Sequence, residues 1–230
     1  NSSQYEEAGF DSTANNLRFY WYATKSGGYQ YNKQTSVSIR DPSAWYHIVM
    51  VLDTNNATQS ERQRIYINNV RITDFGTNNE PTSGANSLVN TVLAHTISGY
   101  FYTTSISNLF DGYITEVNFI DGQALTPSYF AQYDSNNVWQ PKQYTGTYGT
   151  NGFYLPFTSQ FSSTYGAKFD GSSQNLTTST NSNLALGTSD FTVEYWFNPS
   201  VMPPSTAAGI PVCSGNTNAP DLLAPHDPAI

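Results

Sequence analysis

The sequence predicts an all-β protein built as an antiparallel sandwich of two sheets. Three observations support this prediction. Aromatic residues make up 15% of the chain and charged residues only 11%, and aromatic and β-branched residues favour half-buried strands. Apolar and polar residues alternate with a period of two in several segments. Segments rich in Gly, Asn and Ser separate these strands, as turns do in a sandwich.

The alternating segments follow one another along the chain. In the segment 17–23, Leu17, Phe19 and Trp21 share one face and polar or tyrosine side chains share the other. Because successive side chains of a strand point to opposite faces, we expect the apolar set to face the core. Further strands are predicted at 36–40, 45–52, 64–72, 113–120, 153–157 and 191–197.

Turn signals divide these strands. Asn68-Asn69 predicts a tight turn that splits 64–72 into a hairpin. A short helical turn is predicted at 126–130, where Thr126 can cap and Pro127 suits the first helical position. We expect loops at 53–61, 76–87 and 98–108, and a proline-rich loop or extended tail at 203–230.

Charge and composition disfavour several functions. Nine Lys and Arg against 17 Asp and Glu leave a net charge of −8, which disfavours nucleic-acid binding because the phosphate backbone repels an acidic surface. The chain has no run of 18 apolar residues, so we expect no membrane insertion. The single cysteine, Cys213, excludes an internal disulfide and is interpreted as an incidental thiol.

Three pairs of segments resemble the concanavalin A-like, laminin G-like jelly-roll domains. They are RDPSAWYHIV at 40–49 with RIYINNV at 64–70, FDGYITEV at 110–117 with DGQALTP at 121–127, and AKFDG at 167–171 with GTSDFTVEYW at 187–196. The sequences of segments 40–47, 119–128 and 145–157 also resemble laminin G-like modules of marine bacteriophage structural proteins. The resemblance covers about 40 to 200.

The resemblance implies a two-sheet antiparallel jelly-roll sandwich and a division of the chain. Residues 1–157 would form one laminin G-like sandwich without its opening strands. Residues 158–230 would either begin a second module or complete the first, and would end in the proline-rich tail. Both arrangements stay open at this point.

The same resemblance implies a non-enzymatic, lectin-like protein of a virion surface, such as a fibre, spike or capsid decoration. Its partners would be other virion proteins, copies of itself or a glycan on the host surface. The alternative is a purely structural interaction module that binds no sugar.

A second alternative is a glycoside hydrolase of laminarinase type. Glu116, Asn118 and Asp121 have the Glu-x-Asp-x-x-Glu spacing of retaining β-glucanases, which use two carboxyl groups as acid and nucleophile. Here an amide replaces the central carboxylate and a shorter Asp replaces the last Glu, so we predict no catalytic residue. His47, in an otherwise apolar strand, is predicted to be a structural histidine, and His95 and His226 have no neighbours at zinc-ligand spacing.

No cofactor is predicted, with Ca²⁺ left as a candidate at one loop. Asp53 and Asn55 offer oxygen ligands, although their spacing matches no 12-residue calcium loop.

The predicted functional site is the solvent face of the strands. Aromatic faces stack on sugar C–H groups and planar polar groups bind hydroxyls, so a tyrosine-rich outer stripe is suited to a glycan or a protein partner. The predicted stripe consists of Arg18, Tyr20, Tyr22, Arg64, Tyr66, Asn68, Glu194 and Trp196. The loop that carries Tyr100, Phe101 and Tyr102 is a second candidate.

Overall fold

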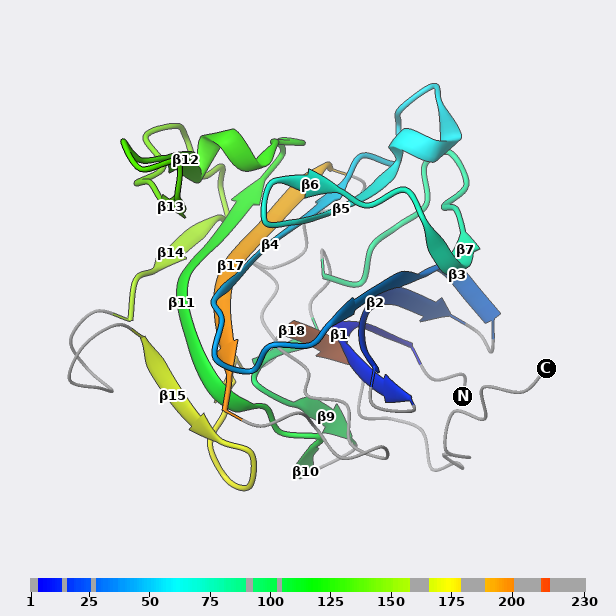
Figure 1. Ribbon diagram of the computed structural model, residues 1–230. Helices are drawn as coiled ribbons and strands as arrows, with labels where there is room; N and C mark the ends of the chain where they lie inside the picture. The colour runs from blue at the N-terminus through cyan, green and yellow to red at the C-terminus, as the bar shows by residue number, and fades with distance from the viewer. Residues whose placement is uncertain are drawn as a thin grey trace.

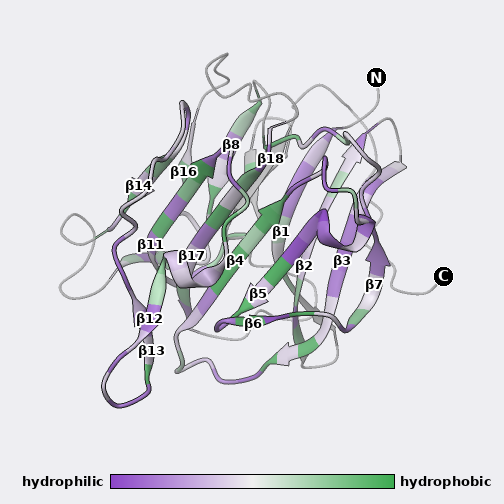
Figure 2. Ribbon diagram, turned by 90° about the horizontal axis from the view of Figure 1, so that it is seen from above, coloured by the Kyte–Doolittle hydropathy of each residue, from purple (hydrophilic) through white to green (hydrophobic). Residues whose placement is uncertain are grey.

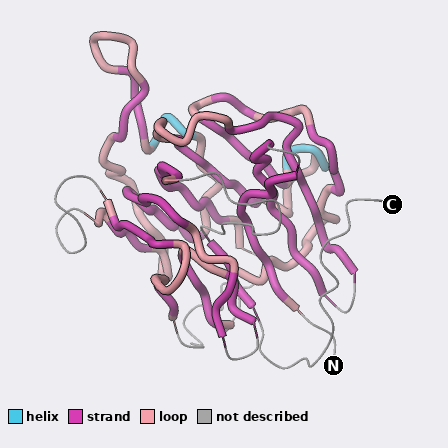
Figure 3. The backbone as a smooth tube through the Cα atoms, turned by 60° about the horizontal axis from the view of Figure 1, so that its bottom comes forward, coloured by secondary structure: helices cyan, strands magenta, loops and turns pink. Residues whose placement is uncertain are grey.

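The computed structural model describes residues 4–13, 16–25, 28–89, 93–102, 105–157, 166–178, 189–200 and 212–215. Strands dominate these residues, and the two short 3-10 turns are their only helical segments (Figure 3). All strand pairs among them are antiparallel. The all-β prediction is therefore confirmed.

One seven-stranded sheet, sheet A, has the strand order β16-β8-β18-β1-β2-β3-β7. The central strands β1, β2 and β3 are the longest of this sheet and form consecutive antiparallel pairs. In the order of the sheet, the bounds are Leu176–Thr177, Ala94–Ile97, Val212–Gly215, Tyr5–Thr13, Asn16–Lys25, Gly28–Ile39 and Phe75–Asn79.

The other seven-stranded sheet, sheet B, has the order β14-β11-β17-β4-β5-β6, and β15 pairs with β11 beside β14. In that order the bounds are Phe153–Leu155, Asp111–Asp121, Phe191–Pro199, Tyr46–Leu52, Gln63–Ile67 and Val70–Arg71, with β15 at Ala167–Asp170. Figure 1 shows this sheet as a curved layer over β1, β2 and β3. As predicted, Asn68 and Asn69 adopt positive φ angles of 49° and 68° in the turn between β5 and β6.

Four short strands lie outside the two large sheets. β9 (Tyr100–Tyr102) pairs with β10 (Ser105–Ser107), and β12 (Ala131–Tyr133) pairs with β13 (Trp139–Pro141). The 3-10 turns are η1 (Gln59–Glu61) and η2 (Pro127–Tyr129).

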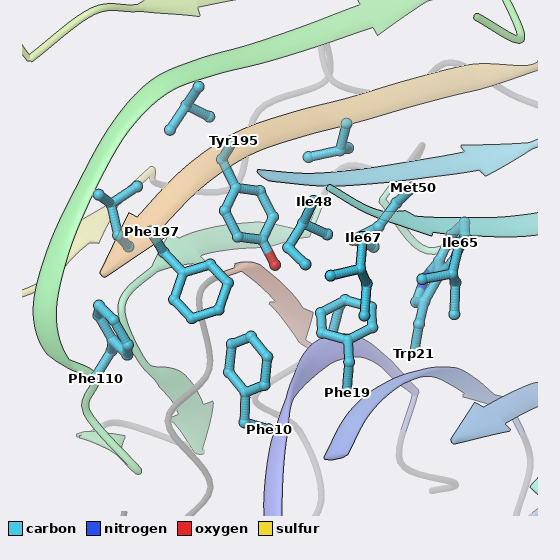
Figure 4. Close-up of a cluster of buried hydrophobic side chains, with 14 of the residues drawn as sticks. Phe10, Phe19, Trp21, Ile48, Met50, Ile65, Ile67, Phe110, Tyr195 and Phe197 are labelled. Atoms are coloured by element: carbon cyan, nitrogen blue, oxygen red, sulfur yellow. The ribbon is translucent and has the colours of Figure 1, made fainter. Parts of the chain in front are cut away.

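The two large sheets face each other across one hydrophobic core. Phe10, Phe19 and Trp21 of sheet A point toward Tyr195 and Phe197 of sheet B (Figure 4). The Phe10 and Phe197 rings are 4.6 Å apart, centroid to centroid. Apolar and polar bands alternate along the strands, as expected where one face of each sheet is buried (Figure 2).

The predicted inward stripe Leu17, Phe19 and Trp21 lies in this core. Ile65 of β5 and the alternating residues Phe191, Val193 and Tyr195 of β17 are buried in it as well. Burying a large apolar side chain stabilises a fold by about 1.5–3 kcal/mol. A strand shifted by one residue would expose these side chains, so their burial fixes which face of each strand points inward.

Strands from both ends of the chain share this core. β17 lies between β11 and β4 in the middle of sheet B, and β18 lies between β8 and β1 in sheet A. The described residues of 158–230 therefore pair with strands of 1–157. The division into two modules stays a prediction for the protein as a whole.

Several predicted loops are strands. Residues 98–108 contain the β9–β10 hairpin, and 75–79 pair with β3 as an edge strand. Residues 212–215, predicted within an irregular tail, form β18. β7 and β18 become strands through pairing with neighbours distant in sequence, which local composition does not show. β9 and β10, in contrast, follow each other along the chain and pair with one another. The turn at 126–130 forms as predicted, but the Thr126 side chain makes no capping hydrogen bond.

Candidate functional site

The predicted outer stripe is divided between two surfaces. Arg18, Tyr20 and Tyr22 lie on β2 of sheet A, whereas the other members lie on sheet B: Arg64 and Tyr66 on β5, Asn68 in the turn after it, and Glu194 and Trp196 on β17. Because the inner faces of the two sheets share the core, their outer faces point in opposite directions. The stripe is thus not a single surface.

The prediction that the stripe is exposed is wrong for most of its members. Tyr20, Tyr66, Glu194 and Trp196 are buried, and Arg18, Tyr22 and Arg64 are half-buried. On sheet B the cause is the segment 123–151, which folds back over the outer face. Its Phe130 and Tyr144 form a second apolar cluster with Val49, Val51, Tyr66 and Ile120 of the sheet.

On sheet A, the tyrosines gather around a carboxyl group. Tyr22 donates a hydrogen bond to Glu7, stacks on Tyr20 at 5.6 Å and meets the Tyr29 ring edge-on at 5.4 Å. Burial raises the pKa of Glu7 to about 7, against the opposing hydrogen bonds of Tyr22 and Tyr20. Tyr29 remains 45% exposed at the rim of this group.

The second predicted site lies on β9, which carries Tyr100 and Tyr102. Their side chains fall outside what the structure describes, so their role stays a prediction.

A polar cluster lies under the covering segment of sheet B, centred on His47 and Glu194. His47 Nε2 lies 2.9 Å from Glu194 Oε1, and both side chains are 0% exposed. The Trp139 indole N–H donates to His47 Nδ1 at 3.0 Å. Because Nδ1 accepts this bond, a neutral ring carries its proton on Nε2, which faces Glu194. The ring also stacks on Trp196, with centroids 4.7 Å apart and planes 15° apart.

Asn118 connects this pair to the next strand. Its amide nitrogen donates to Glu194 Oε2 at 2.7 Å and to the Glu116 carbonyl at 3.1 Å. Its amide oxygen accepts a hydrogen bond from the Tyr148 hydroxyl at 3.0 Å. The amide that replaces the central β-glucanase carboxylate is thus held in place by hydrogen bonds on both its nitrogen and its oxygen.

Glu116 occupies a β-bulge. The pairing of β11 with β17 shifts register between Thr115 and Asn118, and Glu116 has a φ of 54°. A bulge re-aims the side chain that it carries. The Glu116 carboxyl group, half-buried, accepts a hydrogen bond from the Tyr154 hydroxyl at 2.6 Å.

The β-glucanase spacing pairs Glu116 with Asp121, but in the structure the carboxyl group near Glu116 is that of Glu194. Asp121 accepts a hydrogen bond from the Asn151 N–H at 3.2 Å, whereas Glu116 accepts one from Tyr154. Instead β17 brings Glu194 close enough for the Glu116 charge to raise its pKa. Spacing along one strand cannot show a neighbour on another strand, and no sequence signal singled out Asn118 as its partner.

Burial disfavours charge at the centre of this cluster. Burial raises the pKa of Glu194 well above its usual range, although the Asn118 hydrogen bond opposes the shift. Burial also lowers the pKa of His47 to about 3. Burial thus disfavours the charged form of both groups, and the His47 imidazole is neutral at pH 7. Burial and the Glu116 hydrogen bond raise the pKa of Tyr154 as well.

Above this cluster, the β12–β13 hairpin presents exposed aromatic side chains. It projects beyond the edge of sheet B (Figure 2). Tyr133 is 52% exposed and Tyr129, in η2, is 50% exposed. The Tyr133 ring lies 4.9 Å from Trp139, whose indole reaches down to His47. The Trp139 indole thus links the exposed Tyr133 ring to the buried cluster. The side chains of Tyr129, Tyr133, Val138 and Trp139 are called the aromatic platform below; within it the Tyr129 ring lies in η2 and meets Tyr144 edge-on, 6.5 Å away.

The calcium candidates have protein partners. Asp53 Oδ2 accepts a hydrogen bond from the Asn56 side chain at 2.9 Å and lies 3.8 Å from the Arg64 guanidinium; Asn55 also has a partner. Among the described residues, no group of three or more His, Cys, Asp or Glu could hold a metal ion.

No family model, no curated protein and no solved structure matches this chain. Within the described part of the chain, no helix has the length and apolar character needed to cross a bilayer.

Proposed function

We propose that this chain is a non-enzymatic, lectin-like recognition module that binds a glycan through the aromatic platform. Stacking of a sugar C–H face needs flat aromatic surface open to solvent and held in place. Tyr133 and Tyr129 offer that surface, and the hydrogen bond from Trp139 to the buried His47 holds the hairpin that carries it. The proposal rests on one observation: the exposed Tyr133 ring packs on Trp139, and Trp139 is hydrogen-bonded to the buried His47.

The proposal includes the jelly-roll fold of concanavalin A-like and laminin G-like domains, on a virion surface outside the cell. Two facing antiparallel sheets with a shared core are compatible with that architecture. The virion assignment, with other virion proteins or copies of this chain as neighbours, rests on the resemblance of the sequence segments.

The absence of catalysis is part of the proposal. A glycosidase needs two carboxyl groups that both reach the scissile bond. Glu194 is fully buried, with its two oxygens against His47 and Asn118, so of the pair Glu116 and Glu194 only the half-buried Glu116 is partly open to solvent. We expect no release of reducing ends from laminarin or other β-glucans. Release that Glu116→Gln abolishes would contradict this part of the proposal.

Glycan-array binding with two matched variants tests the site. Tyr133→Ala should weaken binding about tenfold or more, since truncating an aromatic anchor removes most of its contact. Tyr29→Ala is the control because Tyr29 has similar exposure but lies on sheet A. Loss of binding in Tyr29→Ala alone would place the site on sheet A. A wild-type chain that binds no glycan but assembles through the platform would establish the structural alternative.

A further inference from the structure

An apolar cavity lies between the two sheets, away from the aromatic platform. Its volume is about 200 Å³. Its walls come from β8 and β16 of sheet A and from β11, β14 and β17 of sheet B. For comparison, an engineered apolar cavity of about 150 Å³ stays dry and accepts benzene. The cavity therefore has room for a ligand of one aromatic ring with small substituents.

The polar groups at this cavity are few. His95 is a wall residue, but both of its ring nitrogens already lie near backbone oxygens, at 2.9 Å from Leu93 O and 2.7 Å from Val89 O. Thr96 is different. It is 1% exposed, it lines the cavity, and its Oγ1 has no hydrogen-bond partner among the residues that the structure describes.

A buried hydroxyl without a partner is unfavourable, and buried polar groups in native proteins are nearly always hydrogen-bonded. Small-molecule sites combine mostly apolar walls with a few well-placed polar groups. We propose that this cavity binds a small, mostly apolar molecule that carries one hydrogen-bonding oxygen, and that the Thr96 hydroxyl pairs with that oxygen. The site is independent of the aromatic platform, so either proposal can fail alone.

Methyl NMR spectroscopy of the whole chain tests the site with p-cresol and p-xylene. The two probes have similar shapes, and the hydroxyl group of p-cresol takes the place of one methyl group of p-xylene. We expect both to shift methyl signals of Val89, Ile97, Val117, Leu176 and Val193, which line the cavity. The Ile48 methyl groups, in the main core of Figure 4, are the internal control and should stay unchanged. No cavity shifts at saturating probe concentration, or equal shifts at Ile48, would overturn the proposal.

The variant Thr96→Val keeps the shape and removes the hydroxyl. In this variant, the dissociation constant of p-cresol divided by that of p-xylene should rise about fivefold, because p-cresol loses one neutral hydrogen bond and p-xylene loses none. An unchanged ratio would overturn the role of Thr96. Because the ratio is taken within one protein, a change in the overall stability of the variant does not affect it.

Discussion

Two carboxyl groups, Glu6 and Glu194, lie buried in this molecule and differ in the number of hydrogen-bond donors around them. Glu6 points inward from β1, near one end of the core. It accepts five hydrogen bonds, from the Trp21 indole, the Tyr31 and Ser87 hydroxyls and the N–H groups of Leu88 and Val89. Donors surround both of its oxygens, and three of the five come from a loop about 80 residues away in sequence.

Glu194 has a poorer set of donors. Asn118 donates to one of its oxygens, and His47 lies at 2.9 Å from the other. With so few donors, burial raises the pKa of Glu194 well above its usual range. The two buried carboxyl groups therefore differ in how far protein donors replace the water that burial removes: five hydrogen bonds reach Glu6, whereas Asn118 and His47 face Glu194.

The largest expected effect is that of Glu6→Gln. The amide nitrogen would face donors where an oxygen now accepts, and leave at least one of them unpaired. We expect a loss of about 3 kcal/mol in the free energy of unfolding, measured by chemical denaturation. A loss below about 1 kcal/mol would show that the five hydrogen bonds are not needed.

Acid should destabilise the fold through His47. Its pKa is about 3 in the folded state and about 6.5 when unfolded, so the unfolded chain binds a proton that the folded chain does not. Stability from this group is complete above pH 6.5 and is lost as the pH falls toward 3. The loss is about 3 kcal/mol at pH 4.

The variant His47→Gln isolates this contribution, since Glu194 acts in the opposite direction over part of the same range. The variant should lose less stability than the wild type between pH 6.5 and 4. Equal pH dependence of the two proteins would contradict the neutral buried imidazole.

The anchoring of the platform is tested by Trp139→Phe. The variant keeps an aromatic ring but removes the N–H that donates to His47. We expect a loss of about 1 kcal/mol and faster hydrogen exchange in residues 131–141, measured by mass spectrometry. If exchange in the hairpin does not change, the bond to His47 does not hold it.

The smallest effect belongs to Glu194→Gln, the same substitution as at Glu6. A glutamine resembles a protonated glutamate, so the change should stay within about 1 kcal/mol near pH 5. The wild type must keep Glu194 protonated as the pH rises above the unfolded value of about 4.3. The variant should therefore gain stability relative to the wild type with increasing pH. A relative loss would mean that Glu194 is ionised in the fold.

The sequence predicted the core better than the outer faces. Alternation placed Leu17, Phe19 and Trp21 inside because period two is a local property of a strand. It could not show that Tyr66 is buried, since the cover is supplied by Phe130 and Tyr144, more than 60 residues later.

The burial of Glu6 and Glu194 was not predicted, for a related reason. β1, which carries Glu6, was not among the predicted strands. The donors that make Glu6 a core residue come from a distant loop. Likewise, Glu194 and Asn118 meet only because of the register of β17 against β11.

The central claim is that the aromatic platform of the β12–β13 hairpin binds the glycan. Intermolecular NOEs between a bound glycan and the aromatic protons of the chain test it most directly. The account predicts contacts from sugar C–H groups to the Tyr133 and Tyr129 rings, which are half exposed. A bound glycan with NOEs only to Tyr29 or to other tyrosines of sheet A would contradict it.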